Sequence, residues 1–433
     1  VGANDVVIVQ QEFALDPGAS QTFPYTWTAP EVTKKENVLW TAATVTLDGV
    51  WTNGGVVAVT NTALHLDGEV CTADLGTLSG TGNTVHVQAQ LDNTSDVLEM
   101  DALLGDWTLN GGSITGGVVN VTTGTALAVL AHTGNLFDGV TVNGDLDMVV
   151  NSSQLVVING LELNGTLTLD VFARILFAGT QSLSGNGMVL LGPNGSHHHK
   201  ALLVRDAGTT LTLESGITVT GHSGLVGGFS GWPLYSPEDV FVINYGTILA
   251  DEPGGTIEVR GTQVTSHGTT GTAAGGNLIA HNLESLGLVQ AYGIGVLTVD
   301  SNLNLFGSAM LQGEPYATLT VHGDLLGDTR NRDRSTPTGT LRLVGSGTAG
   351  NPQLLEVMGE DIGPDPAGFV RNFAHGVLSI GSSTYLRLVD HSDNADGLGS
   401  EALYLDGVIL PEGSTFDLNG LHVYARAVSV HSN

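Results

Sequence analysis

The sequence predicts an all-β fold, a right-handed parallel β-helix (β-solenoid) with an irregular N-terminal segment. Three observations lead to this fold class: strand-like alternation along most of the chain, an internal repeat of about one coil, and abundant glycine at the turns. Glycine accounts for 61 of the 433 residues, and no segment shows a sustained helical period. Hydrophobic residues make up 41% of the chain, which is enough to build a packed core.

The repeat is clearest between residues 140 and 191. The segment 140–148 (VTVNGDLDM) recurs as 161–169 (LELNGTLTL) and, more loosely, as 183–190 (LSGNGMVL). Aligning Leu146, Leu167 and Met188 gives steps of about 21 residues, a length that suits one coil of a solenoid. The repeat therefore predicts stacked coils of similar size.

Each copy of the repeat follows the same physical pattern. Apolar residues alternate with Thr, Asn or Asp, which is the period of a β-strand. Asn-Gly or Gly then turns the chain, because these residues adopt positive φ at low cost. One coil cannot bury its inward face alone, so coils must stack and pair their strands with the coils above and below.

Interruptions of the pattern predict the domain organisation. Residues 1–40 hold several prolines and aromatics and are expected to form a cap or an assembly segment. Residues 41–433 are expected to form a single β-solenoid. Long surface insertions are expected near residues 222–240, 327–338 and 351–373.

The charge balance restricts the partners. Thirteen basic residues stand against 43 acidic ones, a net charge of −30. Nucleic acid is not expected as a partner, because phosphate backbones are bound by basic patches. No stretch of about 18 apolar residues is present, so no membrane span is expected. No cofactor is required by the sequence, although calcium would suit the acidic balance.

Several coils resemble those of bacterial surface proteins. The segments 295–305 (GVLTVDSNLNL), 316–325 (YATLTVHGDL) and 410–423 (LPEGSTFDLNGLHV) are similar to the coils of exported β-helix repeat proteins, both autotransporter passenger-like and planctomycete-type. The resemblance implies export to the cell surface or secretion, and a structural or adhesive role. The start at Val1 in place of Met, with few lysines, fits the same expectation.

Self-association is the leading functional hypothesis. The last strand-like segment, 421–430, runs close to the end of the chain without a recognisable cap, whereas residues 5–13 form a strand-like segment rich in β-branched residues. Strand addition between such ends would join subunits head to tail, which makes a filament or layer. The residues expected to carry this assembly are Val6, Val7, Ile8, Val9, Phe13, Val423, Tyr424, Val428 and Val430.

Two other functions stay open. A monomeric adhesin or glycan-binding stalk would display the loops 222–240 and 327–338. A polysaccharide lyase or hydrolase would need clustered carboxylates, but the acidic residues are scattered and the pectinase-type motif set is absent, so we do not expect an enzyme. The tryptophans could form a sugar-stacking platform, but we expect them to pack in the core or cap. They are Trp27, Trp40, Trp51, Trp107 and Trp232.

Some residues are candidates for metal binding. The densest acidic run suggests a calcium loop, although two expected ligands are missing and a solvated loop is the alternative. Its members are Asp390, Asp393, Asn394, Asp396 and Glu401. The run His197–His199 could bind a metal through two imidazoles, or form a polar turn.

Five sequons make glycosylation possible, but it is not favoured, because most bacteria lack the pathway and chance supplies several sequons in a chain rich in Asn and Thr. Each asparagine is followed two residues later by Ser or Thr, and two of them lie at expected turns. The acceptor asparagines would be Asn93, Asn120, Asn151, Asn164 and Asn194.

Overall fold

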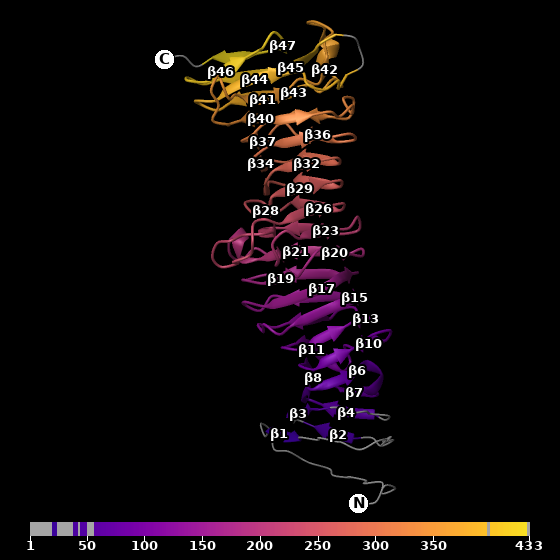
Figure 1. Ribbon diagram of the computed structural model, residues 1–433. Helices are drawn as coiled ribbons and strands as arrows, with labels where there is room; N and C mark the ends of the chain where they lie inside the picture. Colours follow the sequence, from indigo (N-terminus) through magenta and orange to yellow (C-terminus); the bar gives the residue numbers. More distant parts are fainter. Residues whose placement is uncertain (1–19, 24–37, 42–43, 50–55, 396–398, 431–433) are drawn as a thin grey trace, which may run out of the picture. The chain divides into compact units, whose positions relative to one another are not determined.

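The computed structural model describes residues 20–23, 38–41, 44–49, 56–395 and 399–430. The chain divides into two compact units, Val1–Thr168 and Leu169–Asn433, and the division falls in strand β18 (Thr166–Leu169). In each unit short parallel strands stack coil upon coil (Figure 1). The described residues form about 17 turns of a β-solenoid, which confirms the predicted all-β fold of stacked parallel coils.

The strands of unit 1 stack in columns, one strand per coil. One column holds β1 (Ser20–Phe23), β3 (Thr44–Leu47), β5 (Ala63–Leu66), β8 (Asn83–Val87), β11 (Gly105–Leu109), β14 (Ala126–Val129) and β16 (Asp145–Met148). A second holds β2 (Val38–Thr41), β4 (Val56–Thr60) and β7 (Thr77–Thr81). The others are β6 (Glu69–Cys71), β9 (Gln90–Asp92), β10 (Val97–Met100), β12 (Ser113–Thr115), β13 (Val118–Val121), β15 (Leu136–Asn143) and β17 (Gln154–Leu163), with the 3-10 turn η1 (Thr72–Asp74).

Unit 2 has three columns, of which the second carries the candidate functional site. The first holds β21 (Met188–Leu191), β24 (Thr218–Gly221), β27 (Thr247–Ala250), β30 (Thr269–Thr272), β33 (Leu288–Ala291), β36 (Met310–Gly313) and β39 (Thr336–Pro337). The second, the site column, holds β19 (Arg174–Phe177), β22 (Ala201–Val204), β25 (Gly224–Gly227), β28 (Thr256–Arg260), β31 (Asn277–Ala280), β34 (Val296–Val299), β37 (Thr318–Val321), β40 (Thr340–Leu343), β43 (His375–Ile380) and β45 (Glu401–Leu410).

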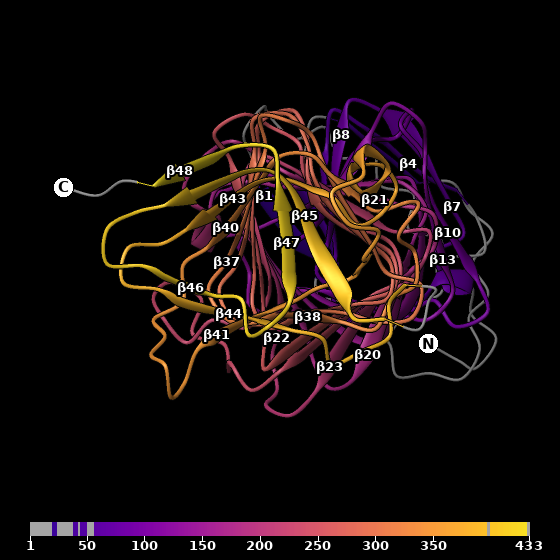
Figure 2. The same ribbon diagram turned by 90° about the horizontal axis from the view of Figure 1, so that it is seen from above.

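The third column of unit 2 holds β20 (Gln181–Ser184), β23 (Thr210–Leu213), β26 (Phe241–Asn244), β29 (Gln263–Ser266), β32 (Leu283–Ser285), β35 (Leu303–Leu305), β38 (Leu325–Gly327), β41 (Gln353–Glu356), β44 (Tyr385–Val389) and β46 (Thr415–Asp417). Strand β45 is long and pairs with both β47 (His422–Ala425) and β48 (Val428–Val430), as the view along the coils shows (Figure 2). The remaining elements are β42 (Gly359–Glu360) and the 3-10 turns η2 (His197–His199) and η3 (Pro366–Phe369).

The core of each coil is a stack of inward side chains in register. In the site column, Val259 pairs with Ala280 and Ala280 pairs with Val299, each fully buried. The same ladder continues through Val321 and Leu343 in later coils. These partners lie 19 to 22 residues apart in the sequence, close to the predicted repeat. Burial of such apolar columns is the main driving force for stacking the coils.

The third copy of the repeat lies one residue out of register with the predicted alignment. Leu146 and Leu167 are buried as expected, whereas Met188 is 37% exposed and its neighbour Val189 points into the core. Because side chains alternate between faces along a strand, a shift of one residue reverses inside and outside.

The expected interruptions are only partly irregular. Residues 222–240 include strand β25, so the loop proper covers residues 228–240. Within the two later insertions, strands β39, β41 and β42 and the turn η3 interrupt the loops. Of residues 1–40, Ser20–Phe23 and Val38–Trp40 are described, and both segments pair as coil strands.

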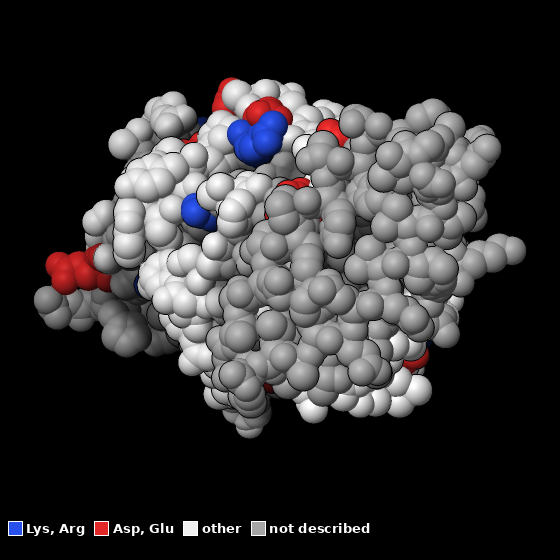
Figure 3. Space-filling model, turned by 90° about the horizontal axis from the view of Figure 1, so that it is seen from below, with Lys and Arg blue, Asp and Glu red and all other residues white. Residues whose placement is uncertain are grey.

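Charged side chains are sparse among the described residues on one face of the molecule. Seen from below, most of the described residues in view are uncharged, with a few separated acidic and basic side chains (Figure 3). Within the described residues, no helix has the length and apolar character needed to cross a membrane.

Candidate functional site

The site lies on the outer face of the site column, where two irregular segments cover the strands. One is the turn η2, and the other is the loop of residues 228–240, called here the aromatic loop. Gly227 ends β25 with φ of 117°, and a Cβ there would lie 1.8 Å from the carbonyl oxygen of Arg260. Only glycine therefore allows β25 to lie this close to the end of β28.

Glu258 lies at the centre of the site although its position in the ladder is apolar. The register places it between Leu225 of the preceding coil and Ile279 of the following coil. Its neighbours Ile257 and Val259 face the core, so the Glu258 side chain points outward. It is nevertheless only 3% exposed. A buried carboxylate requires partners, because an unpaired charge in such a place is costly.

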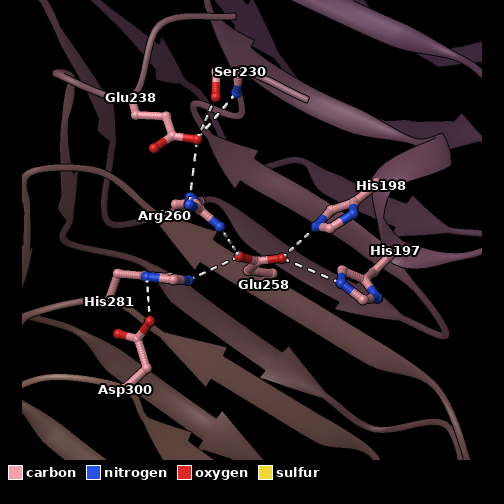
Figure 4. Close-up of polar contacts among 8 residues, drawn as sticks. All are labelled: His197, His198, Ser230, Glu238, Glu258, Arg260, His281 and Asp300. Carbon is pink, nitrogen blue, oxygen red and sulfur yellow. Dashed lines mark hydrogen bonds and ion pairs between the residues drawn. The ribbon is translucent and has the colours of Figure 1, made fainter. Parts of the chain in front are cut away.

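Four side chains supply these partners (Figure 4). Oε2 of Glu258 lies 2.7 Å from Nε2 of His198 and 3.2 Å from Nε2 of His197. Oε1 lies 2.8 Å from Nε2 of His281 and 3.2 Å from a terminal guanidinium nitrogen of Arg260. Each carboxylate oxygen is thus approached by two nitrogens.

The two partners of Oε1, and the aspartate that contacts one of them, come from successive coils. Because Val259 pairs with Ala280 and Ala280 with Val299, the residues that follow them occupy equivalent places. These residues are Arg260, His281 and Asp300. Nδ1 of His281 lies 2.6 Å from Oδ2 of Asp300.

Electrostatics keep this network charged. Burial alone would raise the pKa of Glu258, but hydrogen bonds from His197, His281 and His198 hold it well below its usual range. Burial opposes the charge of His281, yet its hydrogen bonds to Asp300 and Glu258 raise its pKa to about 9. Burial lowers the pKa of His198. Near neutral pH, Glu258 is therefore ionised and His281 is protonated, with both ring nitrogens donating.

The turn η2 is fixed in place by buried polar groups. Asp170 accepts hydrogen bonds from the backbone and side-chain nitrogens of Asn194, at 3.2 and 2.5 Å. The fully buried Lys200 donates to the carbonyl oxygen of Asn194 at 2.5 Å, and burial lowers the pKa of this lysine. At the start of η2, Nδ1 of His199 accepts from the backbone of Ser196. His197 and His198 are therefore held toward Glu258, whereas the ring of His199 is used within the turn.

The aromatic loop is anchored by its apolar side chains. Leu234 is 6% exposed and packs in a cluster with Ala201, Leu203 and Leu225, against which Phe229 also rests. The hydroxyl of Ser236 donates to the carbonyl oxygen of Val204 at 2.5 Å.

Two rings of this anchored loop are nevertheless exposed. Trp232 is 66% exposed and Tyr235 is 69% exposed. Phe172 packs edge-on against Trp232 and stacks on His199. Trp232 therefore does not pack in the core, contrary to the expectation from the sequence, whereas Trp107 is buried as expected.

Three residues of the site could hold a metal ion. The donor atoms of His197, His198 and Glu258 all lie within 4.8 Å of one another. Among the described residues, no other group of three or more His, Cys, Asp or Glu side chains meets this condition.

The candidate calcium residues are engaged in other contacts. Oε1 of Glu401 accepts from the backbone nitrogens of Asn394, at 2.5 Å, and Ala395. Asp390 accepts from the backbone of Glu401 at 3.2 Å, and Asp393 forms a 2.7 Å ion pair with Arg330. Asp396 lies outside the described residues.

Two oxygens in this loop remain without a hydrogen-bond partner in the described part of the chain. They are Oε2 of Glu401 and Oδ1 of Asn394, and both are buried. Burial, helped by the nearby Asp390 and Asp393, raises the pKa of Glu401 to about 7. Calcium binding here stays a prediction.

The predicted assembly residues are described only at the C-terminal end of unit 2. Val6, Val7, Ile8, Val9 and Phe13 lie outside the described residues. In β47, Val423 is partly buried, and the hydroxyl of Tyr424 donates to Asp361 at 2.9 Å. In β48, Val428 and Val430 are 61% and 64% exposed.

The five sequon asparagines differ in accessibility. Asn93 is fully buried, and its amide donates to the carbonyl oxygens of Gly116 and Val118, so the folded chain offers no acceptor there. The amide nitrogens of three others donate to neighbouring side chains, and these are Asn120, Asn164 and Asn194. Asn151 is exposed.

Sequence reasoning singled out the histidine run but missed Glu258, Arg260, His281 and Asp300. The last three are spaced by one coil, so the repeat itself held the signal that they align. Glu258 gave no such signal, because it is a lone acidic residue in an apolar strand. Comparison with protein-family models, curated proteins and solved structures finds no match to this chain.

Proposed function

We propose that this chain is a secreted or cell-surface solenoid that binds neutral glycans through the aromatic loop of unit 2. The observation that carries the proposal is the exposure of Trp232 and Tyr235 on a loop that is otherwise anchored. Single exposed apolar residues are common on protein surfaces, whereas exposed apolar side chains grouped beside polar residues are typical of binding sites. The proposal extends the adhesin-like alternative that the sequence left open.

Aromatic rings are suited to glycans because they offer a flat apolar face beside polar groups. The C–H faces of a sugar ring can stack on Trp232 and Tyr235, while the hydroxyls reach polar atoms at the edge. Glu238 and Ser230 provide such atoms at the same loop, where Glu238 accepts from the hydroxyl of Ser230 at 2.7 Å.

The anchoring of the loop favours affinity. Leu234 and Ser236 hold the backbone between and beside the two exposed rings. A loop that is already ordered loses little conformational entropy when a ligand binds. The two rings are therefore displayed in a fixed arrangement before contact.

The net charge selects the class of glycan. A chain with a charge of −30 repels long polyanions, most strongly at low ionic strength. Neutral polysaccharides escape this repulsion. We therefore expect neutral chains to bind in preference to uronate-rich or sulfated ones.

A glycan array and pull-down with insoluble neutral polysaccharides test the proposal. The wild-type chain should be retained, and Trp232→Ala should weaken retention by about tenfold or more, as expected for a central aromatic contact. Tyr316→Ala is the matched control, because Tyr316 is 84% exposed in unit 2 outside this loop. Absence of neutral glycans among the hits, or equal retention of both variants, would overturn the proposal.

Self-association is a second candidate, supported by the exposed valines of β48. Val428 and Val430 present apolar side chains on a terminal strand of the described chain. Electron microscopy of the purified protein should show filaments that shorten in Val428→Lys if these residues join subunits. Monomers at all concentrations would remove this candidate.

A further inference from the structure

We propose that His197, His198 and Glu258 form a binding site for a divalent transition metal, with zinc as the best-suited ion. The inference is independent of glycan binding. It rests on the convergence of two imidazole nitrogens on a single carboxylate oxygen.

The distances suit a coordination sphere. Zinc binds imidazole nitrogens and carboxylate oxygens at about 2.0 to 2.2 Å, so neighbouring ligand atoms in a tetrahedral site lie about 3.3 Å apart. Oε2 of Glu258 lies 3.2 Å from Nε2 of His197 and 2.7 Å from Nε2 of His198. A small outward movement of the His198 ring would admit the ion.

The other oxygen of Glu258 is held by groups that would form the outer shell. Oε1 contacts both Arg260 and His281, and His281 is itself oriented by Asp300. Outer partners of this kind fix the direction of a ligating carboxylate. As a result, Oε2 is the oxygen left to face the two histidines.

Ring contacts and the anchored turn also hold the two histidine side chains in place. His198 stacks on Phe229 at a centroid distance of 3.8 Å, and His197 contacts His198 edge-on at 4.1 Å. The turn that carries them is anchored by Asp170 and Lys200. Ligands held in place before the ion arrives lose less freedom on binding, which favours affinity.

The chemistry of the donors selects the ion. Two nitrogens and one oxygen suit zinc and its first-row neighbours, whereas calcium and magnesium prefer oxygen ligands alone. The histidine side chains are 29% and 26% exposed, so an ion bound there could take water as a fourth ligand.

Metal titration of the full chain tests the site. Purified protein treated with a chelator and then dialysed should bind one equivalent of Zn²⁺ by calorimetry, and Co²⁺ should give the visible absorption of a tetrahedral site. His198→Gln should abolish both signals. His322→Gln, in an exposed histidine of the same unit, should leave them unchanged.

A direct measurement protects the test against misfolding of the variant. Anomalous diffraction at the zinc edge from wild-type crystals should place the ion between His197, His198 and Glu258. No stoichiometric binding, a zinc peak elsewhere, or equal binding by His198→Gln would overturn the inference. Because Trp232 and Tyr235 do not enter this assay, its failure is separate from failure of glycan binding.

Discussion

Nε2 of His281 donates to Oε1 of Glu258 at 2.8 Å, and this contact joins the turn after β31 to the outward face of β28 in the preceding coil. The pair links coils through side chains, in addition to the backbone ladder. It also buries a charge at a position that Leu225 and Ile279 make apolar on either side. The contacts of Glu258 therefore affect both the local stability of unit 2 and the arrangement of the polar side chains on the outer face of β28.

Replacing Glu258 should destabilise unit 2. Glu258→Gln removes the negative charge that His281 and Arg260 share, and we expect a loss of about 3 kcal/mol in the free energy of unfolding, measured with a chelator present. Glu252→Gln, an exposed acidic residue of the same coil, should change it by less than about 0.5 kcal/mol. Equal stability of the two variants in denaturant titrations would show that the buried network is not stabilising.

Glu401 should make the protein less stable as pH rises. Its pKa is raised to about 7 in the folded chain against an ordinary value of 4.5, so the folded chain holds a proton that the unfolded chain has lost. The contribution of Glu401 to the free energy of unfolding is therefore fully present below about pH 4.5 and is lost as pH rises through 7. Glu401→Gln keeps an acceptor oxygen but carries no charge at any pH. We therefore expect it to raise the free energy of unfolding at pH 8 by up to roughly 3 kcal/mol, seen as a higher Tm, with little change at pH 4.

The same variant tests the calcium prediction. If Asn394 and Glu401 bind calcium through their unpartnered oxygens, Ca²⁺ should raise the Tm of the wild type at pH 8 and have no effect on Glu401→Gln. An equal response of both proteins to Ca²⁺ would place any calcium site elsewhere.

His375 should limit stability in acid. Burial lowers its pKa to about 4, whereas the unfolded residue takes up a proton near pH 6.5. The stability associated with this group is present above about pH 6.5 and is lost as pH falls toward 4. The free energy of unfolding of His375→Leu should therefore rise relative to that of the wild type as pH falls from 6.5 to 4, by up to roughly 3 kcal/mol. Denaturant titrations at successive pH values measure this difference. A constant difference between the two proteins from pH 7 to pH 4 would contradict the assignment.

Loosening the aromatic loop should weaken glycan binding without changing its exposed rings. Leu234→Ala removes the anchor that packs on Ala201, Leu203 and Leu225, at a local cost of about 2 kcal/mol. We expect faster amide hydrogen exchange in residues 228–240 and lower glycan affinity. Faster exchange with full affinity would mean that the loop does not need to be ordered before it binds.

The fold could be predicted from the sequence because its signals are local. Alternation of apolar and polar residues marks the strands, and glycine marks the turns, so neither depends on distant contacts. The inward position of Val189 in place of Met188 could not be predicted, because a local pattern does not fix register, which depends on how neighbouring coils stack.

The site was harder to predict because its residues meet only through the register of the coils. Glu258 and His197 lie far apart in the chain and come together where η2 crosses the outer face of β28. The exposure of Trp232 depends on Leu234 as the anchor of the loop, and an apolar residue two positions away gives no sign of this. The histidine run allowed either a metal site or a polar turn, and the sequence did not identify the carboxylate that faces it.

The most direct test of glycan binding is affinity electrophoresis in native gels that contain soluble neutral polysaccharides. The wild type and Tyr316→Ala should be retarded to the same extent, and the double variant Trp232→Ala/Tyr235→Ala should migrate as in a gel without polysaccharide. Retardation of the double variant equal to that of the wild type would contradict the account.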